Sequence, residues 1–168
     1  MHPDGAGFAY IKNGKAEVVK GLMDFDSFYT KYTRTLKRFP NSVYLIHFRT
    51  GTGGTITPEN THPFYIPKGA LIHNGVMFTP SDKTGRSDTA ILSETIGVKL
   101  KTPADWAINR FKFGDYVGTH NKFCLLFDDG KFLIINEIAG NWEDNVGYSN
   151  TYGWRGNTIN RVGARGMN

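Results

Sequence analysis

The chain has 168 residues, of which 39% are hydrophobic and 21% charged, and its formal net charge is +5. This length fits one domain that buries roughly 70% of its unfolded surface, so the core needs neither a disulfide nor a cofactor to hold it together. The single cysteine excludes an internal disulfide. No apolar run reaches the ~18–20 residues of a membrane helix and no signal-peptide pattern opens the chain, so we expect a cytoplasmic protein.

The positive charge does not by itself predict a nucleic-acid interface. Basic residues occupy one face of a predicted helix and recur in the polar stretch near the C-terminus, at Arg155, Arg161 and Arg165. Phenylalanines and tyrosines recur mainly at core-like spacings instead of alternating with the basic residues. We therefore expect solvated basic surfaces, and we predict neither nucleic acid nor a membrane as a partner.

Two antiparallel strands open the predicted fold. Residues 7–12 and 15–20 are separated by Asn13-Gly14, a pair that readily takes the positive φ angles of a two-residue hairpin turn. From Asp24 to Phe39, apolar residues recur every three or four positions while basic residues occupy the other face. This pattern predicts an amphipathic helix with an aspartate cap and a proline just after its end.

The middle of the chain alternates short strands with helices. Apolar runs at 43–48 and 70–73, bounded by proline, glycine and asparagine, predict buried strands. Apolar spacing over residues 88–100 predicts a second helix, which either Ser87 or Asp88 would cap.

The C-terminal part predicts a third helix and a second hairpin. The helical pattern at 103–111 is weak, whereas strands at 122–128 and 131–137, joined by Asp129-Gly130, form the clearest hairpin of the sequence. Residues 142–148 predict one more strand.

Hairpins that are segregated from helices predict an α+β fold with antiparallel sheets. The pattern assigns residues 1–150 to one domain and residues 151–168 to a polar tail rich in glycine, asparagine and arginine.

Polar side chains gather where the predicted strands end. Arg49 follows the strand at 43–48, and Asn74-Gly75 follows the strand at 70–73. An arginine held at a strand end can pair with a carboxylate, and an acid such as Asp88 can pair with an ammonium group. An amino-acid zwitterion needs both charges. Taken singly, the same residues also fit a surface arginine, a helix cap and an ordinary Asn-Gly turn.

Several fragments, in this order along the chain, resemble the glutamine-binding half of class II glutamine amidotransferases, which are hydrolases with an N-terminal cysteine nucleophile. They are His-Phe-Arg at 47–49, Asn-Thr-His-Pro-Phe at 60–64, His-Asn-Gly at 73–75 and Ser-Asp at 87–88. Pro-Asp-Gly-Ala-Gly at 3–7 resembles the segment that these enzymes place one strand and a loop after the cysteine. Gly-Asn-Trp-Glu-Asp at 140–144 and Tyr-Ser-Asn at 148–150 resemble small stand-alone members of the family found in bacteriophages.

The resemblance assigns roles to six residues: substrate binding to Arg49, Thr50, Thr52 and Asp88, and an oxyanion hole to Asn74 and Gly75. In the family, the matching arginine holds the α-carboxylate of glutamine and the matching acid holds its α-ammonium. The oxyanion hole combines an amide side chain with a glycine backbone N–H. The loop that contains the two threonines consists of small residues and can approach a ligand closely.

Two further positions bear on catalysis. Gly53 occupies a place where family members commonly have histidine, which weakens the expectation of normal turnover. The ring of His62 is expected to pack beneath the site as a structural element, in preference to acting as a base.

The expected nucleophile is missing. An N-terminal-nucleophile enzyme uses its own α-amino group as the base, so a cysteine elsewhere cannot simply replace it. Cys124 lies in an apolar run, where a buried and inert thiol is expected, and His2 would attack an amide poorly. We therefore predict a chain that hydrolyses little or no glutamine by itself.

The resemblance implies a four-layer αββα sandwich that lacks its first strand, so that one sheet has a gap or an exposed edge. Two functions remain open at this point. The chain is either a glutaminase domain that has lost its start, with a separate ammonia-accepting protein as its partner, or a non-catalytic binding or assembly protein, plausibly viral, that reuses the fold. If the pocket is intact, glutamine or glutamate is the expected ligand, whereas in the second interpretation the site residues can persist as scaffold. No metal or other cofactor is implied.

Overall fold

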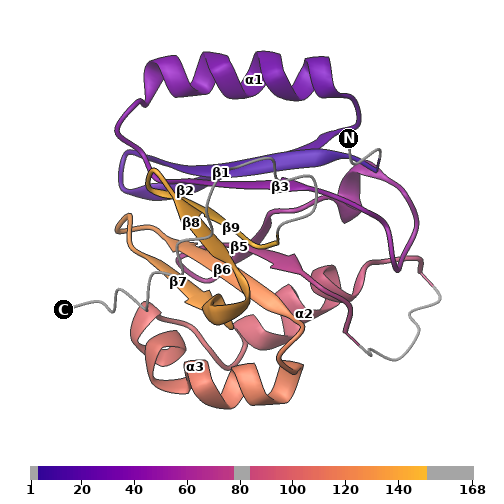
Figure 1. Ribbon diagram of the computed structural model, residues 1–168, viewed down its shortest axis with the longest axis vertical. Coiled ribbons are helices and arrows are strands. Elements are labelled where there is room, and N and C mark those ends of the chain that lie inside the picture. Colours follow the sequence, from indigo (N-terminus) through magenta and orange to yellow (C-terminus); the bar gives the residue numbers. More distant parts are fainter. Residues whose placement is uncertain (1–3, 78–83, 151–168) are drawn as a thin grey trace.

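The computed structural model describes residues 4–77 and 84–150 and shows an α+β fold with antiparallel sheets (Figure 1). The predicted α+β class with antiparallel sheets is therefore confirmed. The polar tail assigned to residues 151–168 lies outside the described residues, as do His2 and Pro3. Within the described ranges, no helix is long and apolar enough to cross a membrane.

The first sheet has three antiparallel strands in the order β2-β1-β3. They are β1 (Ala6–Lys12), β2 (Lys15–Leu22) and β3 (Tyr44–Phe48). The predicted Asn13-Gly14 turn joins β1 to β2, with φ angles of 52° and 72°. The edge strands of this sheet are β2 and β3. Every open sheet has two edge strands, so their presence does not test the prediction that this fold lacks a strand.

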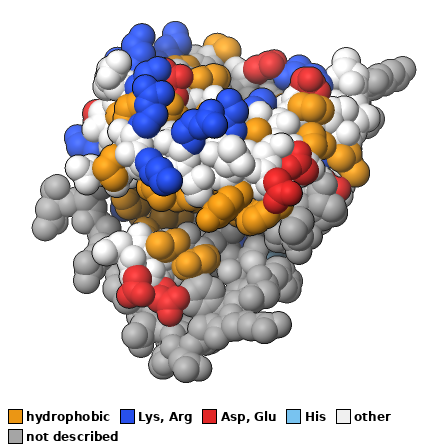
Figure 2. All heavy atoms as spheres, turned by 90° about the horizontal axis from the view of Figure 1, so that it is seen from above, with side chains coloured by type: hydrophobic (Ala, Val, Ile, Leu, Met, Phe, Trp, Pro, Cys, Tyr) orange, Lys and Arg blue, Asp and Glu red, His pale blue; other side chains and the backbone are white. Residues whose placement is uncertain are grey.

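Helix α1 (Phe25–Arg38) covers the outer face of this sheet, as its amphipathic pattern predicted (Figure 1). Asp24 caps it, because its side chain accepts a hydrogen bond from the N–H of Ser27 at 2.8 Å. An aromatic cluster joins helix and sheet, and the Phe28 ring lies 6.0 Å from Phe8 in an edge-to-face arrangement. Figure 2 views the molecule from the α1 side and shows lysine and arginine side chains gathered on the surface of the molecule there.

The second sheet has four antiparallel strands in the order β4-β5-β6-β7. They are β4 (Phe64–Ile66), β5 (Gly69–Asn74), β6 (Lys122–Phe127) and β7 (Phe132–Ile135). The predicted strand at 70–73 and the predicted hairpin at 122–137 are both present. The three-residue strand β4, which follows the short 3-10 helix η1 (Pro58–Asn60), was not predicted.

Helices α2 (Asp88–Gly97) and α3 (Pro103–Val117) cover the outer face of the second sheet (Figure 1). Ser87 is the cap of α2, which decides between the two predicted candidates. Helix α3 continues six residues past its predicted end at Phe111, because Phe113 is buried against the second sheet. Thr102 and Asp105 form a capping box at its start.

A third apolar cluster joins the two sheets. It is formed by the inward-facing residues of both sheets, many of them small: Ala9, Ala16, Leu45, Ala70 and Leu126, with Ile72 and Cys124 packed against them. Helix α1, the first sheet, the second sheet and the pair α2 and α3 thus follow one another through the molecule (Figure 1).

The region predicted as one strand at 142–148 is a small hairpin, so that prediction was wrong in part. Strands β8 (Asn141–Glu143) and β9 (Val146–Tyr148) pair with each other and follow the short 3-10 helix η2 (Glu137–Ala139). Asp144 and Asn145 form the turn with φ angles of 47° and 65°. These two residue types tolerate the left-handed region, so no glycine is needed there.

Candidate functional site

Three segments that carry the predicted site residues meet at one end of the two sheets, on the right in Figure 1: the loop after β3, the end of β5 and the start of α2. A Cβ atom at Gly54, in the first of these segments, would lie 2.9 Å from the backbone nitrogen of Ser87, so the loop packs directly on the helix start. The side chain of Asp88 accepts a hydrogen bond from the N–H of Met77 at 2.8 Å, which ties the helix start to the segment after β5.

Arg49 directly follows β3 and is only 4% exposed. Its backbone N–H donates to the carbonyl of Gly5 at 2.8 Å, and its Nη2 donates to the carbonyl of Gly53 at 2.9 Å. Its Nη1 is buried and has no hydrogen-bond partner within the part of the chain that the structure describes. A buried guanidinium with an unused donor is costly unless an acceptor reaches it, and a carboxylate is the acceptor that fits this geometry best.

The segment Asp4-Gly5-Ala6-Gly7 supports the loop after Arg49. A carboxylate oxygen of Asp4 accepts a hydrogen bond from the N–H of Gly51 at 2.7 Å. A Cβ atom at Gly7 would lie 2.2 Å from the carbonyl oxygen of His62, and Gly5 has a φ angle of 105°. Only glycine meets both requirements, which explains the residue types of this fragment.

Thr50, Thr52 and Gly53 are all exposed in this loop. A Cβ atom at Gly53 would meet no other atom within 4 Å, so the position has room for a larger side chain. Packing in this structure therefore does not require a glycine at this position. The substrate-binding roles of the two threonines stay predictions.

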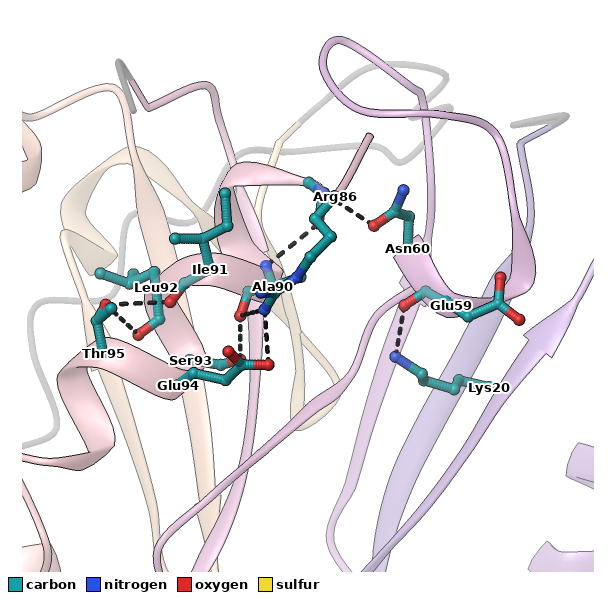
Figure 3. A network of polar contacts seen from close by, with 11 residues as sticks. Lys20, Glu59, Asn60, Arg86, Ala90, Ile91, Leu92, Ser93, Glu94 and Thr95 are labelled. Carbon is teal, nitrogen blue, oxygen red and sulfur yellow. Dashed lines mark hydrogen bonds and ion pairs between the residues drawn. The ribbon is translucent and has the colours of Figure 1, made fainter. Parts of the chain in front are cut away.

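Asn60 holds the loop against α2 and is 3% exposed (Figure 3). Its Nδ2 donates to the carbonyls of Thr55 at 2.9 Å and Gly85 at 2.8 Å, while its Oδ1 accepts from the N–H of Ser87 at 2.8 Å. The sequence analysis included Asn60 in a fragment without giving it a role. Its partners lie up to 27 residues away along the chain, a separation that no local pattern reveals.

Asp88 is half-buried at the first position of α2. One carboxylate oxygen accepts from Met77, and the other accepts from the N–H of Thr89 at 2.6 Å and lies 3.1 Å from the Thr89 hydroxyl. Each oxygen of an ionised carboxylate can accept about two hydrogen bonds, so a further donor can still be accommodated. Its position in the first turn also places a carboxylate near the positive end of the helix dipole, where a negative charge is stabilising.

Asn74 and Gly75 stand where β5 ends. Gly75 is exposed and has a φ angle of 145°. A Cβ atom at Gly75 would lie 2.2 Å from the side-chain oxygen of Asn121, so this position requires glycine. Asn121 thus supports the backbone of the predicted oxyanion hole from below, a role that the sequence analysis did not anticipate.

His73 precedes this pair and is 2% exposed. Its ring stacks on Phe123 at 4.3 Å between centroids, and its two nitrogens lie 2.8 Å from the Thr89 hydroxyl and 2.8 Å from the side-chain oxygen of Asn121. Burial lowers the pKa of His73, and the bond to Asn121 and the charge of Asp88 offset part of this effect.

His62 packs beneath the site, between His47 and Phe64. Its Nδ1 lies 3.0–3.1 Å from the ring nitrogens of His47, and His47 in turn donates from Nε2 to the carbonyl of His73 at 3.0 Å. Burial, followed by the neighbouring positive and imidazole groups, lowers the pKa of His62 well below its usual value. This environment favours the structural role expected of His62.

Cys124 lies on β6 opposite Ile72 and packs against the cluster between the sheets. Burial raises the pKa of its thiol to about 12, with a smaller contribution from Glu137. A thiol of this kind is essentially un-ionised at neutral pH and is a poor nucleophile, as expected from the sequence. Among residues 4–77 and 84–150, no group of histidine, cysteine and acidic side chains is arranged to hold a metal ion.

No known protein-family model matches the sequence, and no characterised protein matches it significantly. The case for a function therefore rests on the geometry of the chain itself.

Proposed function

We propose that the chain is a glutamine-binding domain of the class II amidotransferase type, with the αββα sandwich of that family. The observation that carries this proposal is Arg49, a nearly fully buried guanidinium whose Nη1 lacks a partner among the described residues. It lies on a loop that packs against the start of α2, where Asp88 provides the opposite charge. An arginine and an acid carried by two adjoining segments suit the zwitterionic end of an amino acid.

In the proposed complex, Nη1 of Arg49 donates to the α-carboxylate of glutamine while Asp88 accepts from its α-ammonium group. Charge-assisted hydrogen bonds contribute roughly 1.5–3 kcal/mol each, so the two together can account for most of a weak affinity. The exposed loop with Thr50 and Thr52 would cover the bound amino acid. The side-chain amide of glutamine would then point toward Asn74 and the backbone N–H of Gly75.

The chemistry of these 168 residues supports the binding of glutamine without its hydrolysis. The only cysteine of the sequence is Cys124, and its raised pKa and its position between the sheets make it unsuitable as a nucleophile. The chain would then deliver or sense glutamine in concert with a separate ammonia-accepting or assembly protein. A virion or host-cytoplasm setting, suggested by the resemblance to phage proteins, belongs to the same proposal.

Isothermal titration calorimetry with L-glutamine tests the binding claim. We expect the purified chain to bind glutamine, and we expect Arg49→Lys and Asp88→Asn each to weaken binding by roughly tenfold or more, since each removes one charge-assisted contact. Glutamate should bind as well, because both amino acids share the α-carboxylate and the α-ammonium group. An ammonia-release assay on the same sample should give no signal above background.

Matched control variants are Arg34→Lys on the exposed face of α1 and Asp115→Asn on the exposed face of α3. Each makes the same chemical change away from the site and should leave the affinity unchanged. Glutamine binding that is indifferent to Arg49→Lys and Asp88→Asn would remove the basis of the proposal. Ammonia release by the wild-type chain would contradict the non-hydrolytic form of it, and loss of that release in Cys124→Ser would identify Cys124 as the nucleophile.

A further inference from the structure

A continuous line of hydrogen bonds runs from the loop before β6 to the carboxylate at the start of α2. Asn121 contacts Nε2 of His73 at 2.8 Å, Nδ1 of His73 contacts the Thr89 hydroxyl at 2.8 Å, and that hydroxyl lies 3.1 Å from Asp88. His73, Thr89 and Asn121 are each at most 7% exposed, so water does not compete freely for these contacts. The line ends at the acid proposed to hold the ammonium group of glutamine.

The direction of each hydrogen bond follows from one fixed donor. The side-chain Nδ2 of Asn121 donates to the carbonyl of Val117 at 2.6 Å, so the side-chain oxygen faces His73. An oxygen can only accept, and Nε2 of His73 must therefore carry a proton. In the neutral ring Nδ1 is then an acceptor, and it becomes a donor only when the ring is protonated.

The Thr89 hydroxyl has one hydrogen and two possible acceptors. With a neutral His73 the hydroxyl can donate to Nδ1 at 2.8 Å or to the Asp88 carboxylate at 3.1 Å, and the shorter contact favours donation to Nδ1. With a protonated His73 it accepts from Nδ1–H, and its own hydrogen turns to the carboxylate of Asp88. Protonation adds one proton at Nδ1 and rotates one O–H bond, and no other atom needs to move.

We propose that His73 is a positioning residue for Asp88 and that the Thr89 hydroxyl transmits its protonation state to the carboxylate. This inference rests on the proposed function, because Asp88 is taken as the acid that holds the ammonium group of the substrate. When His73 is neutral, the Thr89 hydroxyl donates to the ring, and the carboxylate oxygen of Asp88 next to it can accept from the ammonium group. When His73 is protonated, the Thr89 hydroxyl donates to that oxygen instead, and the ring adds a positive charge close to the site.

Three titratable groups face His73 from the elements packed around it. Asp88 on α2 favours the protonated ring through its charge. His62, with a ring centroid 6.4 Å away, has a pKa far below its ordinary value and so stays neutral when His73 titrates. His47 on β3 donates to the backbone carbonyl of His73 at 3.0 Å and also contacts the ring of His62. Among these three groups, Asp88 is the one whose charge favours protonation of His73.

The sign of the pH effect follows from this arrangement. Glutamine binding places an ammonium group at Asp88, which opposes a second positive charge on His73. Glutamine should therefore bind more weakly as the pH falls through the pKa of His73, by roughly fivefold if the coupling has the usual size of such linkages. Because the linkage is reciprocal, bound glutamine should lower the pKa of His73.

The test measures the imidazole nitrogens of His73 by two-dimensional NMR between pH 5 and pH 8. It uses the wild-type chain and the variants Thr89→Val, Thr89→Ser and Asp88→Asn, each alone, and Asp88→Asn combined with either threonine variant. We expect neutral His73 to carry its proton on Nε2. We also expect Asp88→Asn to lower the pKa of His73 in the wild-type and Thr89→Ser backgrounds, and to lower it less in the Thr89→Val background.

A neutral ring with its proton on Nδ1 would overturn the proposal, as would an equal effect of Asp88→Asn in all three backgrounds. Thr89→Ser keeps the hydroxyl and so separates its loss from a general disturbance of the helix start. Calorimetry with glutamine at pH 5.5 and pH 8 completes the design. Absence of glutamine binding would refute the proposed function, whereas the NMR result decides the link between His73 and Asp88 independently of any ligand.

Discussion

At the scale of single residues, the backbone at Gly75 is the most constrained point of the candidate site. Its φ angle of 145° is rare for any other residue type, and the side chain of Asn121 fills the space that a Cβ atom would need. Asn121 cannot retreat easily, because it also bonds to His73 and to Val117.

We expect Gly75→Ala to lower the free energy of unfolding by about 2 kcal/mol or more, from backbone strain together with the displaced Asn121. Urea unfolding monitored by circular dichroism measures this. Gly53→Ala is the matched control, since a Cβ atom there meets nothing within 4 Å. Equal stabilities of the two variants would show that Gly75 does not hold this conformation in solution.

The sequence could indicate Arg49, Asn74, Gly75 and Asp88, because each stands at the end of a strand or the start of a helix in a recognisable fragment. It could not indicate Asn60, Thr89 or Asn121 as supports. Thr89 is 16 residues from His73 and Asn121 is 48 residues away, so their contacts depend on how the strands pair and where the helices pack. Residue types alone do not carry that information.

At the scale of elements, most predictions rested on turn and cap chemistry, and these were confirmed where the signals were strong. Asn13-Gly14 and Asp24 have the conformations that their positions require. Predictions were wrong where the signal was short or mixed. Strand β4 has only three residues, and the turn between β8 and β9 uses Asp144-Asn145 instead of a glycine pair.

Helix α3 shows how packing overrides local preference. Gly114 lies inside the helix, beyond the predicted end at Phe111, although glycine in a helix is unfavourable by about 1 kcal/mol relative to alanine. In the structure Gly114 packs closely against Asn136, and a Cβ atom would lie 3.0 Å from the Asn136 side-chain oxygen. The glycine thus allows close approach of helix and loop and does not end the helix.

The capping box at the start of α3 gives a prediction at this scale. Thr102→Ala removes the hydroxyl that accepts from the N–H of Asp105 at 3.1 Å, and we expect it to lower the free energy of unfolding by about 1 kcal/mol. Thr102→Ser keeps the acceptor and should stay within a few tenths of a kcal/mol of the wild type. Chemical denaturation of both variants decides the matter, and equal losses would assign the effect to packing instead of capping.

At the scale of the whole molecule, buried histidines connect stability to pH. Burial lowers the pKa of both His62 and His73, whereas both would titrate near their ordinary value, about 6.5, in the unfolded chain. Below about pH 7 the unfolded chain therefore binds more protons than the folded one, and acid shifts the equilibrium toward unfolding.

We expect the free energy of unfolding to be highest above about pH 7 and to fall between about pH 7 and pH 5, with a slope of at most about 1.4 kcal/mol per pH unit from each histidine and a smaller contribution from His73 than from His62. Urea titrations at several pH values measure this slope. His62→Gln should make it shallower, even if the variant is less stable throughout. A free energy of unfolding that stays constant over this range would mean that the two rings are not buried as neutral groups in solution.

Three apolar layers hold the molecule together, and the candidate site lies at the end of the two sheets where β3 and β5 stop. This placement puts the charged groups on segments anchored by rigid strands and a capped helix. The central claim is that this end of the molecule binds the zwitterionic part of glutamine through Arg49 and Asp88.

A crystal structure of the chain grown with saturating L-glutamine tests that claim most directly. We predict that the α-carboxylate of the ligand lies within hydrogen-bond distance, about 3 Å, of Nη1 of Arg49, with the α-ammonium group on Asp88. Glutamine bound elsewhere, or a site that stays empty at saturating concentration while Arg49 pairs with another group of the chain, would contradict it.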